Sequence, residues 1–185
     1  MEDMEIRSLV SRLTLEEKAA LCEMIFIKNG NEADVRLGSV PRFGIHGIRN
    51  CDNGEGGDYV SFQPQETLHG EHRTCYPQAA ALAATFDRET VRRVGAAIGR
   101  DARSANAQLL LRPGVNIKRT PLCGRNFEYF SEDPVLAGEL AGAYIRGVQE
   151  SGTAACLKHY AVNNHEYDRM TANAVVRERS PTRMG

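Results

Sequence analysis

Two helical patterns alternate with two short apolar runs in the second half of this chain, and this alternation restricts the fold more than any other feature. A helix is predicted over 88–104 with Asp87 as its N-cap, and the apolar run 108–112 (QLLLR) follows it. A second helix is predicted after the N-cap Asp133, and the apolar run 154–160 (AACLKHY) comes next. Short apolar strands that alternate with helices indicate βαβ units and a parallel sheet.

Each predicted helix carries one apolar stripe at helical spacing, which should face the sheet. Pro134 suits the first turn of the second helix, because the N–H that it lacks would have been unpaired there. Gly152 suits the C-cap of the same helix. The predicted buried stripes are Val91, Val94, Ile98 and Ala102 in the first helix and Leu136, Leu140, Tyr144 and Val148 in the second.

The connections between these elements differ in length. Each helix reaches the next strand within a few residues, whereas the connection 113–133 from strand to helix takes about twenty. Such long connections lie at the carboxyl ends of parallel strands, where ligands bind. The layout is therefore typical of an active site. Polar residues concentrate in this connection and after the second strand: Lys118, Arg119, Arg125, Asn126, Glu128, Glu132, Asp133, Lys158, His159, Asn163, Asn164, His165, Glu166, Asp168 and Arg169.

The first part of the chain is harder to interpret. A helix is predicted over Thr14–Met24, because Thr14 and Glu17 form a capping box. Residues 29–73 show no sustained period, so we expect loops around one short apolar run, Phe43–Ile48.

Composition excludes several classes of protein. Lys and Arg (23) and Asp and Glu (24) nearly cancel to a formal charge of −1, which predicts neither nucleic acid nor an anionic membrane as a partner. No apolar run approaches the ~18 residues of a spanning helix. The five cysteines are scattered and odd in number, and the N-terminus is acidic rather than signal-like. We therefore expect a cytoplasmic location.

The end of the chain interrupts the pattern. After Val176 another helix is expected, but residues 179–185 contain Pro and Gly instead. A complete (β/α)8 barrel needs at least ~200 residues. The prediction is an α/β fold, a partial (β/α)8 TIM-barrel-like domain in which the chain ends before the barrel is complete.

Four motifs resemble glycoside hydrolase family 3, in the family's order and spacing. They are LTLEEK (13–18), TCYPQAAALAATFD (74–87), RPGVNIKRTPLCGRNFEYFSEDP (112–134) and AACLKHYAVNNHEYDRM (154–170). The resemblance implies that residues 1–179 are the N-terminal part of the family's barrel domain in a β-glucosidase-like protein. Residues 180–185 would form a tail outside the family pattern.

The resemblance also implies which residues hold the sugar. A carboxylate such as Asp52 accepts hydrogen bonds from two hydroxyls, and the fork of Arg125 suits two neighbouring sugar oxygens. Lys158 and His159 match a Lys-His pair at a strand end, and Arg169 matches an arginine near the same pocket. The predicted substrate-binding residues are Asp52, Arg125, Lys158, His159 and Arg169.

The residues alone also allow other roles. Asp52 could cap its own turn, Arg125 could pair with Glu128 or Glu132 to shape the loop, and a Lys-His pair is often a solvated surface. A desolvated Lys158 could instead form a Schiff base in an aldolase-like barrel. The segment 69–72 (HGEH) suggests a metal site, but it lacks the i, i+4 histidines of HExxH, so a solvated loop is favoured.

The activity that the resemblance implies is retaining hydrolysis of β-glycosidic bonds in β-D-glucosides or short β-glucans, with no metal and no cofactor. The family's nucleophile and acid/base residue lie later in the sequence than the Lys-His motif, so no catalytic residue is expected among these 185 residues. The chain alone should be inactive or a weak sugar-binding fragment. An incomplete sheet also exposes an apolar edge strand, through which copies of the chain could associate.

Overall fold

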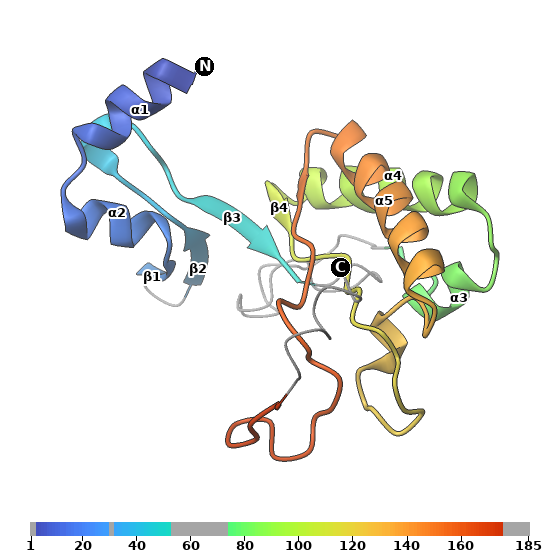
Figure 1. Cartoon of the computed structure of the whole chain (residues 1–185). Coiled ribbons are helices and arrows are strands. Elements are labelled where there is room, and N and C mark those ends of the chain that lie inside the picture. Colours follow the sequence, from blue (N-terminus) through green and yellow to red (C-terminus); the bar gives the residue numbers. More distant parts are fainter. Residues whose placement is uncertain (1–2, 30–31, 53–73, 176–185) are drawn as a thin grey trace.

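The computed structural model describes residues 3–29, 32–52 and 74–175, which form two parts that strand β3 connects (Figure 1). The N-terminal part holds two short helices and a hairpin, and the second part holds longer helices beside short strands. The N-terminal elements are α1 (Asp3–Ser11), α2 (Leu15–Leu21), β1 (Met24–Asn29), β2 (Glu32–Leu37), the 3-10 turn η1 (Pro41–Phe43) and β3 (Ile48–Cys51). The second part consists of α3 (Ala79–Ala83), α4 (Arg88–Ser104), β4 (Leu109–Leu110), η3 (Asn126–Glu128), α5 (Pro134–Glu150) and β5 (Ala154–Ala155).

The five strands form one sheet in the order β1-β2-β3-β4-β5. The pairs β1–β2 and β2–β3 are antiparallel, whereas β3, β4 and β5 run parallel, with Cys51 opposite Leu110 and Leu110 opposite Ala155. Helices α4 and α5 connect the parallel strands in turn. This strand–helix alternation is that of a TIM-barrel-like α/β fold, and the predicted fold class is confirmed for the part of the chain that the structure describes.

The N-cap residues of α4 and α5 are the two that the sequence predicts. The Asp87 side chain accepts from the N–H of Glu89, and the Asp133 side chain accepts from the N–H of Val135 and Leu136. The C-cap of α5 is Ser151 rather than Gly152, which follows it with a φ of +78°. The left-handed glycine is therefore placed one residue beyond the cap, where it ends a helix in many proteins.

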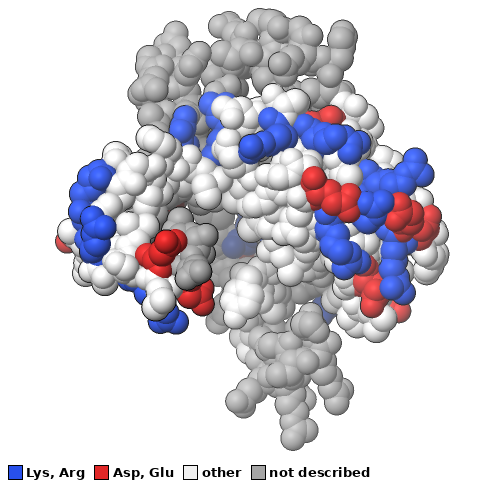
Figure 2. Space-filling view, turned by 90° about the horizontal axis from the view of Figure 1, so that it is seen from above, with Lys and Arg blue, Asp and Glu red and all other residues white. Residues whose placement is uncertain are grey.

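The core lies between these two helices and the parallel strands. Their predicted stripes are buried, except for Val94 and Leu136, which are partly buried against the same cluster. Glycines bring the helix backbones close together: a Cβ on Gly147 would lie 2.0 Å from the carbonyl oxygen of Arg92. The outer side of this pair carries acidic and basic side chains next to each other (Figure 2), including an Arg92–Glu150 ion pair of 2.6 Å.

The prediction of loops over residues 29–73 is wrong where the structure describes this segment, because it contains β2 and β3. The predicted helix Thr14–Met24 has the expected capping box, but it ends at Leu21, and Met24 begins β1. Helix α1 and the short helix α3 were also not predicted. In these places strand pairing and packing decide the structure more than local propensity does.

The two predicted strands are shorter than their apolar runs. Pro113 follows the first run and has no N–H to donate, so regular pairing stops near it. After β5, backbone hydrogen bonds to this segment run from Lys158 N–H to Pro113 O (2.9 Å) and from Val115 N–H to Lys158 O (2.7 Å), outside the regular strands. None of the helices in the described ranges is long and apolar enough to cross a membrane.

Candidate active site

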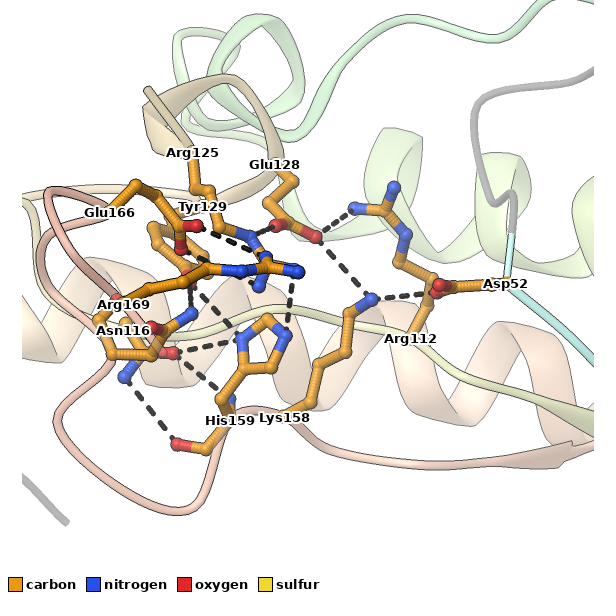
Figure 3. Close-up of polar contacts among 11 residues, drawn as sticks. Asp52, Arg112, Asn116, Arg125, Glu128, Tyr129, Lys158, His159, Glu166 and Arg169 are labelled. Atoms are coloured by element: carbon orange, nitrogen blue, oxygen red, sulfur yellow. Dashed lines mark hydrogen bonds and ion pairs between the residues drawn. The ribbon is translucent and has the colours of Figure 1, made fainter. Parts of the chain in front are cut away.

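The carboxyl ends of the three parallel strands bring distant segments together. Asp52 directly follows β3, the long connection follows β4, and Lys158 and His159 follow β5. Gly114 bridges to both Tyr129 and Lys158, which ties the long connection to the end of β5. As a result, all five predicted site residues belong to one polar network (Figure 3): Asp52, Arg125, Lys158, His159 and Arg169.

Glu128 is the centre of this network. Its side chain is 3% exposed and faces three cations: Arg125 Nε, Arg112 Nη1 at 3.3 Å and Lys158 Nζ at 3.4 Å. Burial disfavours the carboxylate, but Arg125, Lys158 and Arg112 outweigh burial, and the pKa of Glu128 lies below its usual value. Glu128 is therefore an ionised anchor for the cations around it.

Lys158 links Glu128 to Asp52. The Lys158 ammonium lies 2.7 Å from Asp52 Oδ1 on one side and 3.4 Å from Glu128 Oε2 on the other. Lys158 Nζ is therefore held between two carboxylates. This contact also gives Asp52 a partner 106 residues away, so the carboxylate is not limited to capping its own turn.

Arg125 uses three of its nitrogens. Nε donates to Glu128, Nη2 lies 2.8 Å from His159 Nε2, and Nη1 lies 3.7 Å from Glu166 Oε1. The pairing of Arg125 with Glu128, which the sequence allowed as an alternative to sugar binding, is therefore present. Burial disfavours the charged guanidinium, but the carboxylates outweigh it and raise the pKa of Arg125. A guanidinium has five N–H groups, so the pairing leaves donors for a ligand.

His159 is held on both sides of its ring. Nε2 faces Arg125, and Nδ1 lies 3.1 Å from the Tyr129 hydroxyl and 3.3 Å from Asn116 Oδ1. Burial lowers the pKa of His159, and the nearby positive charges of Arg125 and Lys158 lower it further. The ring is therefore neutral near pH 7.

Arg169 lies at the margin of the network. It donates to Glu166 Oε2 at 3.1 Å, and its side chain is 61% exposed. Arg169 and His165 join Arg125 and His159 in lining a hollow of about 420 Å³. The hollow has room for a ring-sized ligand, and its arginines and histidines supply polar contacts.

Three residues of the network were not predicted from the sequence. Arg112 is buried at the end of the apolar run before the long connection, and a charged residue at the end of a buried strand is a signal that could have found it. Asn116 and Tyr129 hold His159 through contacts across 43 and 30 positions of the chain. No local pattern marks these two residues.

The described residues contain no group of three or more His, Cys, Asp or Glu side chains that could hold a metal ion. The HGEH segment 69–72 lies outside the described residues.

Known proteins are similar to this chain over most of its length. Residues 62–183 match the family model described as Glycosyl hydrolase family 3 N terminal domain. Thermostable beta-glucosidase B of Acetivibrio thermocellus is 46% identical over 181 residues, which cover 95% of this chain and 23% of that protein. Beta-glucosidase B of Emericella nidulans is 41% identical over 176 residues, which cover 95% of this chain and 19% of that protein.

A solved structure, beta-glucosidase 3B from Thermotoga neapolitana in complex with glucose, superimposes with a TM-score of 0.77 at 37% identity. The match covers 90% of this chain and 24% of that chain. The 185 residues thus span less than a quarter of the length of these relatives.

Proposed function

Because this chain belongs to glycosyl hydrolase family 3, we propose that it supplies the sugar-binding residues for retaining hydrolysis of β-D-glucosides or short β-glucans. The observation that carries the proposal is the single network of Asp52, Lys158, Glu128, Arg125 and His159 at the carboxyl ends of three parallel strands. The relatives named above as β-glucosidases support the substrate class.

The network suits a polyhydroxylated ring because it presents donors and acceptors side by side. The Asp52 carboxylate accepts from hydroxyls, while the Lys158 ammonium and the unused N–H groups of Arg125 donate to them. In retaining hydrolysis, positive charge develops on the sugar ring, and hydrogen bonds to its hydroxyls that tighten in the transition state lower the barrier. We assign this task to Asp52, Arg125, Lys158 and His159, and we place Arg169 at the entrance of the same pocket.

The carboxyl groups that the structure describes in this network form ion pairs with cations, and we assign none of them to bond cleavage. A general acid must hold a proton at the working pH, whereas the pKa of Glu128 is lowered. Asp52 contacts Lys158, and Glu166 contacts Arg125 and Arg169. We therefore propose that these 185 residues position the sugar and provide neither the nucleophile nor the acid/base.

Two further proposals concern the cellular location of the protein and the association of its copies. None of the five cysteines, all of which lie in the described part of the chain, forms a disulfide bond, which supports a cytoplasmic location. The outer edge of β5 pairs with no described strand, which supports self-association through this edge.

The test of the sugar-binding proposal is a calorimetric titration of the chain with glucose and an aryl β-D-glucoside. We expect the unmodified chain to bind both ligands, and Lys158→Ala and Arg125→Ala to weaken binding at least tenfold, since a charge-assisted bond contributes roughly 1.5–3 kcal/mol. Arg88→Ala, at an exposed arginine on α4, is the control and should bind normally. Equal affinities for all four proteins would refute the assignment. If the unmodified chain hydrolyses the aryl glucoside and Lys158→Ala does not, the proposal that this chain provides neither the nucleophile nor the acid/base is refuted.

A further inference from the structure

His159 lies between groups whose hydrogen-bonding roles are fixed, so the position of its ring proton follows from the geometry. The Arg125 Nη2 group lies 2.8 Å from His159 Nε2. A guanidinium donates and never accepts. Nε2 must therefore present its lone pair to Arg125, and the proton of the neutral ring must reside on Nδ1.

Asn116 leads to the same result from the other side of the ring. The backbone N–H of His159 donates to Asn116 Oδ1 at 2.9 Å, and Asn116 Nδ2 donates to the carbonyl oxygen of His159 at 3.4 Å. These two bonds fix which end of the Asn116 amide is the oxygen. That oxygen lies 3.3 Å from His159 Nδ1, where it can only accept.

The Tyr129 hydroxyl supplies a third constraint. It lies 3.1 Å from the carbonyl oxygen of Asn163, which can only accept, so the single phenolic proton is directed there. The Asn163 amide donates to the same hydroxyl at 3.1 Å. The phenol oxygen, 3.1 Å from His159 Nδ1, is therefore left as an acceptor toward the ring. The ring meets donors at Nε2 and acceptors at Nδ1.

We propose that Asn116 and Tyr129 are positioning residues that hold His159 in its neutral, Nδ1-protonated tautomer, with Nε2 as a fixed acceptor beside the guanidinium of Arg125. Figure 3 shows the ring between these partners. The lowered pKa of His159 agrees with a neutral ring.

The functional consequence rests on the proposed sugar-binding role of Arg125 and His159. A hydroxyl group donates one hydrogen bond and accepts others. A sugar hydroxyl that displaces the Arg125–His159 hydrogen bond can therefore donate to the lone pair of Nε2 and accept from the N–H of Arg125 that this leaves free. The other tautomer would present two donors, and this match would be lost.

The experiment is ¹⁵N NMR of the histidine rings in the full 185-residue chain at neutral pH and without sugar, with His159→Gln used to identify the signals of this ring among the five histidines. We expect a proton on Nδ1 and none on Nε2. In Tyr129→Phe and Asn116→Ala we expect the two nitrogen signals to move toward each other, because the Nε2-protonated form becomes populated. Tyr167→Phe, at an 82% exposed tyrosine, is the matched control and should leave both signals in place.

A wild-type ring protonated on Nε2, or variant signals at their wild-type positions, would overturn the proposal. If Asn116→Ala does not fold, Tyr129→Phe decides alone, because the phenyl ring keeps the packing. Glucoside binding is measured separately: Tyr129→Phe should weaken it about 2- to 10-fold, as expected for one lost hydrogen bond. A chain that binds no glucoside would refute the proposed function, while the ring spectra would still decide the tautomer.

Discussion

At the scale of single residues, the site depends on one buried anion. Glu128 contacts Arg112, Arg125 and Lys158, and through them it reaches Asp52 and most of the network. A 3% exposed carboxylate among three cations is ionised because the cations outweigh the cost of burial. Removing its charge would leave Arg112, Arg125 and Lys158 around a neutral side chain in place of the carboxylate that they share.

Glu128→Gln is therefore expected to destabilise the chain at pH 7 by about 3–5 kcal/mol, the range for removing the charge of one partner in a buried ion pair. Urea unfolding followed by circular dichroism measures this change. Glu132→Gln is the matched control in the same loop, at an exposed residue, and should stay within about 0.5 kcal/mol of wild type. A Glu128→Gln protein of wild-type stability would contradict the anchoring role.

The pH dependence of stability has a definite sign for Glu128. Its pKa is lower in the folded chain than the ordinary value of 4.5, so the unfolded chain binds more protons below pH 4.5. The contribution of Glu128 is complete above pH 4.5 and is lost as the pH falls through the folded pKa. Between pH 4.5 and that value, the unfolding free energy should decrease less steeply in Glu128→Gln than in wild type. Parallel curves for the two proteins would show that Glu128 does not titrate in this way.

At the scale of elements, the packing of α4 against α5 forms a large part of the core. The caps of these helices are local, and their close packing depends on glycines that bring one helix backbone against the other. At Gly147, the atoms nearest to an added Cβ are the backbone atoms Arg92 O, at 2.0 Å, and Ala96 N, at 2.8 Å. Backbone atoms cannot move aside without separating the two helices.

Gly147→Ala should therefore destabilise the chain by about 1–3 kcal/mol, the usual cost of overpacking. Gly138→Ala on the same helix is the control, because nothing lies within 4 Å of its added Cβ. That variant should be neutral or more stable by up to about 1 kcal/mol, since alanine favours a helix over glycine. Thermal unfolding of both variants measures the difference, and equal shifts in Tm would rule out the close contact.

At the scale of the whole molecule, α4 and α5 pack against the sheet, and β5 is its last strand in the described part of the chain. Backbone N–H groups of Ala154, Cys156 and Lys158 donate toward the β4 side, so those of Ala155 and Leu157 alternate to the outer edge. The Leu157 side chain is 55% exposed beside this edge. Unpaired strand groups next to an apolar side chain favour pairing with another strand.

We expect the chain to self-associate with increasing concentration in analytical ultracentrifugation, and Leu157→Lys to reduce this association, because a charge at a strand edge disfavours pairing. Leu122→Lys is the matched control, at an 89% exposed leucine in the long connection, and should associate as wild type does. A wild-type chain that remains monomeric over the whole concentration range would contradict the proposal.

The sequence by itself determined the parts of this protein that depend on neighbours within a few positions. The caps Thr14, Asp87 and Asp133 and the buried stripes of α4 and α5 are of this kind, because a cap or stripe involves residues one to four positions apart. The sequence between the paired residues Asn29 and Glu32 is Gly30-Asn31, a pair typical of a two-residue hairpin turn, so β1–β2 also has a local signal.

Only the tertiary structure decided which side chains meet. Asp52 and Lys158 lie 106 positions apart, and their contact exists because β3 and β5 flank β4 in one parallel sheet. The motifs predicted Lys158 and His159 as site residues, whereas the proton position that we propose for His159 depends on donors and acceptors from Asn116, Tyr129 and Arg125. Those partners come from a connection without a periodic pattern, so their placement follows from strand pairing and burial, which local sequence does not encode.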